Sequence, residues 1–234
     1  MKQLILPVIA ALLIFAACKK NSDTDIPVTR SSFMFFNGVE GTQFKVMLDT
    51  NVITDKVAYS EYTAYKSFRA QKYNIYLYEA NNPTQLINGG EINLRNNRYF
   101  SAYLFLDTAR KQLLMRTTED DLTSLGEGTG KFRVLNISQT YKPDKSAMNM
   151  DVVRINSVKR DTVRYARAVS FATLTPFGAW PANSDDSLYF RWIDSTGVLK
   201  QIQFPVQAGK VYTLVTAGNL LDPTKFKVYT IQHN

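Results

Sequence analysis

The sequence predicts an all-β protein with two tandem antiparallel β-sandwich domains, and three observations support this fold class. From Ser31 onward, short runs alternate apolar and polar residues, which is the period-two pattern of strands. Asn, Gly, Asp and Pro separate these runs, and no long segment has the 3.6-residue period of a helix. The apolar pattern also occurs twice along the chain. Short strands at this spacing favour sandwiches over α/β units.

An apolar leader precedes the strands. Lys2 gives it a positive start, Leu4 to Ala17 form the apolar run, and Cys18 follows as the only cysteine. A membrane-spanning helix needs about 20 apolar residues, so this shorter run suits a removed signal peptide. The segment resembles the bacterial lipoprotein signal with its lipobox, although Phe15 stands where that family most often has leucine. The resemblance implies cleavage before Cys18 and its acylation; the alternative is an ordinary signal peptide with an incidental cysteine.

These features predict a signal peptide over 1–17 and a lipidated flexible tether over 18–30, because the tether residues are polar and aperiodic. The expected location is the cell outer membrane, with the lipid on Cys18 as the membrane contact. Asp23 and Asp25 resemble the acidic surface-export signal of Bacteroidetes lipoproteins, and a periplasm-facing spacer is the alternative. Processing leaves a net charge of +7, typical of a solvated surface that also suits contact with an anionic lipid or glycan. An anionic glycan or an envelope protein is therefore the expected partner besides the membrane. Nucleic acid is not an expected partner of an exported protein.

The repeat is visible as a constant offset of 112 positions. Val57, Tyr59, Thr63, Tyr65, Phe68 and Ala70 correspond to Val169, Phe171, Thr175, Phe177, Trp180 and Ala182. Upstream, Phe35-Phe36-Asn37 matches Val134-Leu135-Asn136, and downstream Tyr99 is paired with Tyr212. We therefore expect one sandwich over 31–116, a linker over 117–130 and a second sandwich over 131–234.

The strands that end in Asn37 and Asn136, together with the late Gly-Lys-Val-Tyr-Thr-Leu-Val segment at 209–215, resemble the tandem domains of the domain-of-unknown-function 4397 family. That family is common in Bacteroidetes lipoproteins. The resemblance implies an immunoglobulin-like sandwich and no established chemistry. The first copy departs from the pattern, with Asn96-Asn97-Arg98-Tyr99 where the glycine would lie.

The residues give no pattern for catalysis. His233 is the only histidine and is penultimate, where chains fray, so no Ser-His-Asp triad or histidine metal site is expected. Gly126 to Lys131 lacks both the first glycine and the Ser or Thr of a phosphate loop. Asp185 and Asp186 are typical of a turn, whereas a glycosidase needs two carboxylates that face each other. We expect no catalytic residue, no metal and no cofactor, and hence no enzyme.

Two features favour binding. A basic segment contains Arg154, Lys159, Arg160, Arg164 and Arg167, and Arg160, Arg164 and Arg167 are our candidates for contact with an anionic partner. The alternative is a solvated strand edge protected by its charges. Tyr76 and Tyr78 alternate with Ile75 and Leu77, so they share the opposite face of a strand and could stack on sugar. Burial at the interface with the second domain is the alternative for that face.

The resulting hypothesis is a non-catalytic, lipid-anchored envelope protein that acts in recognition, adhesion or assembly at the outer membrane. A carbohydrate-binding accessory lipoprotein is the first alternative, and an exposed aromatic platform with polar neighbours would distinguish it. A glycan-cleaving enzyme is the second, and it would require a cleft with two facing carboxylates.

Overall fold

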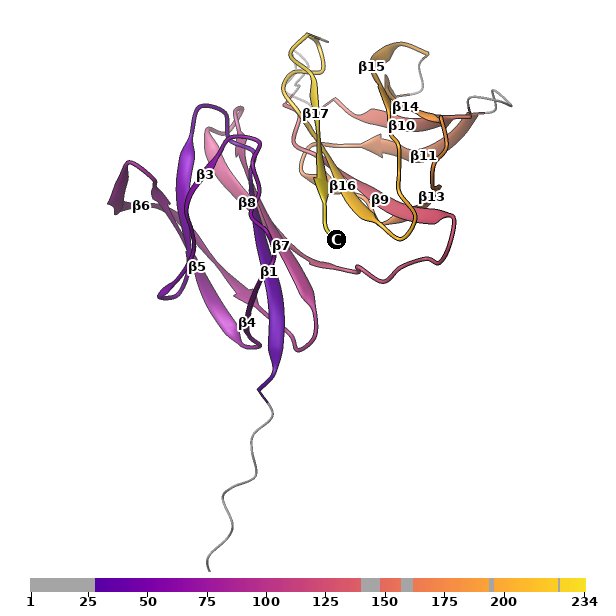
Figure 1. Cartoon of the computed structure of the whole chain (residues 1–234). Helices are drawn as coiled ribbons and strands as arrows, with labels where there is room; N and C mark the ends of the chain where they lie inside the picture. Colours follow the sequence, from indigo (N-terminus) through magenta and orange to yellow (C-terminus); the bar gives the residue numbers. More distant parts are fainter. Residues whose placement is uncertain (1–27, 140–147, 157–161, 194–195, 223) are drawn as a thin grey trace, which may run out of the picture.

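The computed structural model describes residues 28–139, 148–156, 162–193, 196–222 and 224–234, and within them every regular element is a strand (Figure 1). The strands form four sheets that build two β-sandwich-like domains. The predicted all-β, two-sandwich fold class is therefore confirmed. Cys18 and the leader lie outside the described residues. Within the described part of the chain, no helix has the length and apolar character needed to cross a membrane.

The first sandwich contains eight strands in two sheets, ordered β4-β1-β7-β8 and β3-β2-β5-β6. The strands are β1 (Arg30–Asn37), β2 (Gln43–Leu48), β3 (Asn51–Ala58), β4 (Lys66–Arg69), β5 (Lys72–Glu79), β6 (Asn82–Asn93), β7 (Tyr99–Asp107) and β8 (Gln112–Asp120). Alternation fixes which face is buried: in β2, Phe44, Val46 and Leu48 point into the core, as the period-two pattern predicts.

The second sandwich repeats this order as β12-β9-β16-β17, with β13 also paired to β9, and β11-β10-β14-β15. Its strands are β9 (Thr129–Asn136), β10 (Met150–Ile155), β11 (Thr162–Val169), β12 (Thr173–Leu174), β13 (Gly178–Pro181), β14 (Ser187–Trp192), β15 (Val198–Gln203), β16 (Val211–Ala217) and β17 (Lys227–Gln232). The connection between the sandwiches is 121–128, because β8 and β9 extend into the range expected for the linker.

The repeat extends to individual hydrogen bonds. Asn37 Nδ2 donates to the Val57 carbonyl at 3.2 Å, and Asn136 Nδ2 donates to the Val169 carbonyl at 3.0 Å. Both asparagines are fully buried at the end of the first strand of their sandwich. A buried amide is stabilised only when it is hydrogen-bonded, so each asparagine joins its first strand to its third. This role explains why the apolar runs of both copies end in the same polar residue.

A threonine in each copy makes a second shared contact. Thr63 Oγ1 accepts from the Phe35 amide at 3.0 Å, and Thr175 Oγ1 accepts from the Val134 amide at 2.9 Å. The aromatic pairs of the repeat are less uniform: Trp180 is fully buried, whereas Phe68, Tyr59 and Phe171 are half-buried.

The strand pairing differs from a wholly antiparallel arrangement at one place in each sandwich. β1 pairs with β7 in parallel, and β9 pairs with β16 in parallel. The same ladders show that the expected match of Tyr99 with Tyr212 is wrong by one residue. Ser32 and Lys131 are at equivalent positions of the repeat, and Ser32 faces Tyr99 whereas Lys131 faces Val211. Val211 is therefore the residue equivalent to Tyr99. Tyr99 is accordingly exposed, while Tyr212 is buried. A shift of one residue moves a side chain to the other face of a sheet.

Asn97 replaces the glycine of the second copy at a tight turn. It has a φ of 53°, and Gly209 has a φ of 73°. Their amides make matching hydrogen bonds, from Asn97 to the Arg30 carbonyl at 2.7 Å and from Gly209 to the Thr129 carbonyl at 2.9 Å. Asparagine tolerates this left-handed region better than other residues with a side chain, so the first copy retains the turn without glycine.

Among the described residues, three apolar cores hold the two sandwiches together. Each sandwich encloses one, and the third lies between the two domains, where the sheet β4-β1-β7-β8 faces the sheet β12-β9-β16-β17. The fully or nearly fully buried members of this interdomain core are Met34, Phe36, Tyr103, Phe105, Leu135, Ile137, Val215, Ala217 and Ile231. β1 therefore buries both of its faces, with Phe33 and Phe35 in the first sandwich and Met34 and Phe36 in the interdomain core.

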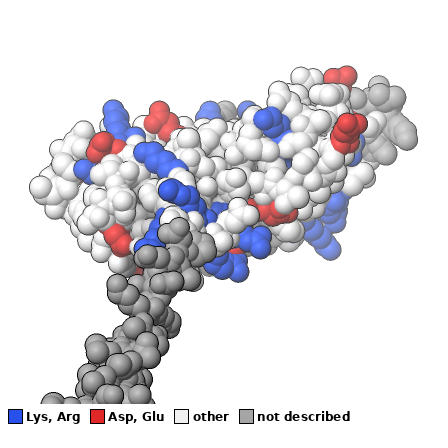
Figure 2. Space-filling view, turned by 60° about the horizontal axis from the view of Figure 1, so that its bottom comes forward, with Lys and Arg blue, Asp and Glu red and all other residues white. Residues whose placement is uncertain are grey.

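The surface carries charges of both signs. Figure 2 shows Lys and Arg side chains over both sandwiches with Asp and Glu side chains between them, and a band of basic side chains crosses the first sandwich beside the grey segment. The net charge of +8 for the whole sequence is therefore distributed over a large area.

Candidate functional site

A ring of buried polar side chains joins the two domains beside the interdomain core. Asp120 and Tyr65 come from the first sandwich, and Arg133, Thr213 and His233 come from the second. Arg133 Nη2 pairs with Asp120 Oδ1, and Arg133 Nε donates to Thr213 Oγ1 at 3.0 Å. His233 lies between Thr213 Oγ1, at 2.7 Å from Nε2, and the Tyr65 hydroxyl, at 2.8 Å from Nδ1. The Tyr65 hydroxyl then donates to Asp120 Oδ2 at 2.7 Å and closes the ring.

One set of proton positions satisfies every bond of this ring. Because Tyr65 donates to Asp120, its oxygen accepts from His233, so the imidazole proton lies on Nδ1. Thr213 accepts from Arg133, and its own hydroxyl proton is free for the lone pair of His233 Nε2. In this arrangement the histidine is neutral, and each domain supplies partners that the other needs.

Burial shifts the titration of the ring members. Desolvation lowers the pKa of His233 to about 4, with the Asp120 charge acting against this shift and the Arg133 charge adding to it. Desolvation and the Asp120 carboxylate raise the pKa of Tyr65 well above its usual range. His233 is 7% exposed, so the expectation of a frayed terminal histidine is wrong. Its sequence position gave no sign of these partners, which lie at residues 65 and 213.

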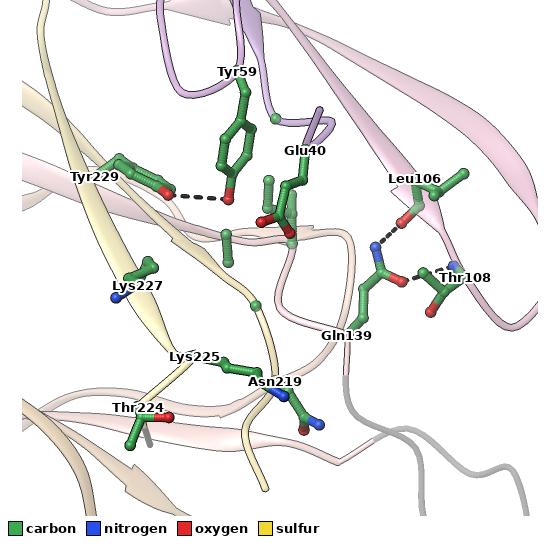
Figure 3. Close-up of a pocket in the computed structure, with 14 residues that line it drawn as sticks. Glu40, Tyr59, Leu106, Thr108, Gln139, Asn219, Thr224, Lys225, Lys227 and Tyr229 are labelled. Carbon is green, nitrogen blue, oxygen red and sulfur yellow. Dashed lines mark hydrogen bonds between the residues drawn. The ribbon is translucent and has the colours of Figure 1, made fainter. Parts of the chain in front are cut away.

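A pocket of about 620 Å³ opens at the same domain junction, at the end of β1 opposite the turn formed by Asn97 (Figure 3). The first sandwich supplies Leu106 from β7 and Gly38, Glu40, Tyr59 and Thr108 from its loops. The second sandwich supplies Ile137, Gln139, Ala217, Gly218, Asn219, Thr224, Lys225, Lys227 and Tyr229. Both domains are therefore needed to form its walls.

Two tyrosines form an aromatic wall of the junction pocket. The Tyr229 hydroxyl donates to the Tyr59 hydroxyl at 3.0 Å, and their rings pack edge to face with centroids 5.8 Å apart. Burial, followed by the hydrogen bond to Tyr229, raises the pKa of the Tyr59 phenol above its usual range. The Tyr59 phenol is thus neutral at physiological pH and keeps its own proton to donate. Figure 3 shows the Glu40 carboxylate beside Tyr59, with Lys225 and Lys227 across the pocket.

The shape of the pocket depends on two close contacts between the domains. Gln139 accepts from the Thr108 amide at 2.7 Å and donates to the Leu106 carbonyl, so a second-sandwich side chain holds the end of β7 (Figure 3). At Gly38, a Cβ atom would lie 2.5 Å from Ile137 Cδ1 and 2.8 Å from the Leu104 carbonyl oxygen. Glycine is therefore required for this approach of the two domains.

The charged groups of the pocket are few and differ in their partners. Lys225 pairs with Asp222 at 3.3 Å. Neither Lys227 nor Glu40 has an oppositely charged group within 4.0 Å among the residues that the structure describes. Glu40 is the one carboxylate in the described lining, and no group of three potential metal ligands of the His, Cys, Asp or Glu type occurs in the described ranges. This lining offers hydrogen bonds and aromatic contact to a ligand.

The predicted tyrosine face lies away from the junction. Tyr76 and Tyr78 are half-buried on the outer face of the sheet β3-β2-β5-β6, whereas the interdomain core uses the other sheet of that sandwich. Tyr76 faces Met47 on one side and Gly89 on the other, and Tyr78 faces Lys45. The interface alternative for this face is therefore wrong.

The predicted basic segment is divided by acidic partners from other parts of the second sandwich. Arg154 pairs with Asp186, and Arg164 Nε lies 3.7 Å from Asp151. Arg167 is exposed on β11, and Arg160 lies outside the described residues. Asp151 and Asp186 lie outside this segment in the sequence, and the pairing of β10 with β11 and β14 brings them close to it. The side chain of Asp186 is thus engaged with Arg154 and with Asn156 at 3.0 Å.

Comparisons with known proteins give a family match for part of the chain. Residues 31–144 match the model of the family described as Domain of unknown function (DUF4397). The match covers the first sandwich and strand β9 of the second. No curated protein matches the chain.

Three solved structures show distant similarity. A leucine-rich repeat protein from Bacteroides thetaiotaomicron is 14% identical with a TM-score of 0.21; the match covers 82% of this chain but only 26% of that one. A carbohydrate-binding module from Eubacterium rectale, solved with maltoheptaose, is 6% identical with a TM-score of 0.25, over 85% and 96% of the two chains. A candidate cell adhesion protein from Bacteroides uniformis is 13% identical with a TM-score of 0.28, over 88% and 98%.

Proposed function

We propose that this protein is a non-catalytic, lipid-anchored protein of the cell envelope that binds a polar ligand, of the saccharide class, in the junction pocket. The observation that carries the proposal is that both domains build this pocket around Tyr59 and Tyr229. Ligand sites are concave, occur preferentially at domain interfaces and commonly have volumes of about 300–1,000 Å³. The pocket volume of about 620 Å³ is within this range.

The chemistry of the lining favours a ligand rich in hydroxyl groups. Tyrosine rings offer flat apolar area with a polar edge, and such rings pack well against the C–H faces of sugars. Lys227 can donate hydrogen bonds, Glu40 can accept them, and neither charge is satisfied by an ion pair within the described structure. Asn219, Thr224 and the Tyr59 hydroxyl add uncharged polar groups to the same lining.

The junction also favours binding because its walls are fixed before a ligand arrives. The interdomain core, the polar ring and the Gln139 contacts all hold one sandwich against the other. A preorganised site loses less conformational entropy when it binds, so more of the contact energy appears as affinity.

We expect Tyr229→Ala to weaken saccharide binding about tenfold or more, since it removes one aromatic wall and the partner of Tyr59. The measurement is a screen of immobilised neutral and acidic oligosaccharides with the mature chain, followed by calorimetric titration of the best ligand. The paired substitution Tyr76→Ala with Tyr78→Ala serves as the matched control. It removes tyrosines from the sheet β3-β2-β5-β6 of the first sandwich, which lies away from the junction.

Two outcomes of that screen would contradict the proposal, one for the site and one for the absence of catalysis. Loss of binding in the Tyr76 and Tyr78 variant, with Tyr229→Ala unchanged, would assign recognition to the outer sheet face. Cleavage of the oligosaccharide during titration would contradict the non-catalytic part of the proposal. Circular dichroism of both variants, matching the unsubstituted protein, shows that the comparison concerns folded molecules.

The lipid anchor is tested separately at Cys18. We expect the mature chain extracted from membranes to begin at a diacylated or triacylated Cys18, because the leader combines a short apolar run with small residues before the cysteine. Two or more acyl chains give stable anchoring, whereas one gives marginal binding. Intact-mass and peptide mass spectrometry make the measurement. An unmodified cysteine, or Cys18→Ser protein that stays in the membrane fraction, would refute the anchor.

A further inference from the structure

The end of the first sandwich where the described chain begins is formed by three segments that backbone contacts hold together. Arg30, in the first strand, faces Arg69 across the β1–β4 ladder. The Arg30 amide donates to the Asn96 side chain at 3.1 Å, and the Ser32 amide donates to the Arg98 carbonyl at 2.8 Å. The Leu94 amide reaches the Gln71 carbonyl at 2.9 Å. Residues 30, 69–72 and 94–98 therefore lie at one end of the domain, which we call the base.

The base carries an excess of positive charge on exposed side chains. Its basic residues are Arg30, Arg69, Lys72, Arg95 and Arg98. Two acids counter them: Glu91 pairs with Lys72 at 2.7 Å, and Glu119 pairs with Arg95 and with Arg98 at 3.5 Å. Arg30 and Arg69 have no ion pair with any described residue. Figure 2 shows the basic side chains of the first sandwich beside the point where the grey chain leaves it.

The position of the base limits its distance from Cys18. Eleven residues, 19–29, separate Cys18 from Arg30. A fully extended chain spans at most about 3.6 Å per residue, so Arg30 stays within about 45 Å of the lipidated residue. The surface of the membrane that holds the lipid is thus always within reach of these arginines.

We propose that the base docks on the anionic phospholipid headgroups of the membrane in which the lipid on Cys18 is inserted. This inference rests on the lipid anchor of the proposed function. Guanidinium groups suit phosphate because they are planar, always charged and able to donate two parallel hydrogen bonds. Charges near an anionic membrane surface attract it with a range of about one Debye length, so the tether supplies proximity and the arginines supply orientation.

Docking in this way would direct the junction pocket toward the surroundings. Gly38, in the pocket lining, follows the far end of β1, whereas Arg30 begins that strand. The eight residues of β1 span about 25 Å at a rise of about 3.3 Å per residue. With β1 along the membrane normal, the pocket would lie about that distance above the lipid surface and stay accessible to a large saccharide.

The test uses the mature chain, 18–234 with Cys18→Ser, so that no acyl chain contributes to binding. We expect it to sediment with vesicles of about 30% phosphatidylglycerol in phosphatidylcholine at low salt, and to lose this binding near 0.5 M salt as the Debye length shrinks. The variant Arg30→Gln with Arg69→Gln should bind about 25-fold more weakly, at about fivefold for each arginine removed.

The control is Lys56→Gln with Arg110→Gln, which removes the same charge from the other end of the same sandwich. Binding of this control should equal that of the unsubstituted chain. Equal losses in the two variants would overturn the proposal, because net charge alone would then explain the attraction. Equal binding to pure phosphatidylcholine would also overturn it. Neither result depends on the acylation of Cys18 or on saccharide binding, so failure here is distinguishable from failure of the proposed function.

Discussion

Arg133→Met should destabilise the protein by about 3–5 kcal/mol, which is the expected loss when one partner of a buried ion pair is removed. Asp120 has no exposed side-chain area, so its carboxylate would remain buried with only hydroxyl donors. Thr213 would also lose its Arg133 donor. Unfolding in guanidinium chloride, followed by tryptophan fluorescence and by circular dichroism, measures the change. Because the pair spans both domains, we expect the two sandwiches to separate before either unfolds.

Arg98→Met is the matched control for Arg133→Met. Its partner Glu119 is about one-quarter exposed and Arg98 is mostly exposed, so the expected change is within about 1 kcal/mol. The double variant Asp120→Leu with Arg133→Met should regain much of the lost stability, since it removes the uncompensated charge together with its partner. Equal stability of Arg133→Met and Arg98→Met would contradict a structural role for the ring.

Acidification should weaken the same junction through His233. Its folded-state pKa of about 4 lies below the ordinary value of 6.5, so the unfolded chain binds the proton more tightly between these values. Stability contributed by the neutral imidazole is thus fully present above pH 6.5 and is lost as pH falls toward 4. The linkage relation gives a loss of about 2 kcal/mol at pH 5 and about 3 kcal/mol at pH 4. Denaturant midpoints at several pH values measure this slope.

His233→Gln isolates the histidine from the carboxylates that titrate in the same range. The groups that face His233 are Tyr65, Asp120, Arg133 and Thr213, with the Phe177 ring nearby. Glutamine keeps a donor and an acceptor but does not titrate, so the variant should be less stable at pH 7 and show a shallower dependence between pH 6.5 and 4. An unchanged slope would mean that the imidazole titrates normally in the folded protein.

Much of the fold is predictable from the sequence because local patterns determine it. Alternation in β2 and β5, and the recurrence of Asn37 and Thr63 as Asn136 and Thr175, reflect contacts that each sandwich makes internally. The parallel pairing of β1 with β7 is less visible, since it joins residues that are 67 positions apart in the sequence. A signal was nevertheless present: Phe33-Met34-Phe35-Phe36 is continuously apolar, which indicates a strand buried on both faces.

The junction could not be predicted in the same way. Asp120, Arg133 and His233 are ordinary polar residues in the sequence, and only the packing of two folded domains makes them buried partners. The same reason applies to the junction pocket, whose lining comes from residues 38 to 229 with no shared motif. For the basic segment near Arg164, the sequence predicts more unpaired positive charge than the structure has. The acidic partner of Arg164, Asp151, comes from the neighbouring strand and not from the segment itself.

The parallel ladder between β1 and β7 also has a mechanical consequence. A pull on the amino-terminal side of β1, with the resisting load at the junction pocket, acts along the axis of that strand. Six residue pairs join β1 to β7, and four more join it to β4 on its other side. A force along the strand loads these hydrogen bonds in shear, so they must fail together and not one after another. The first strand would therefore serve as the force-bearing element of a tethered molecule under flow.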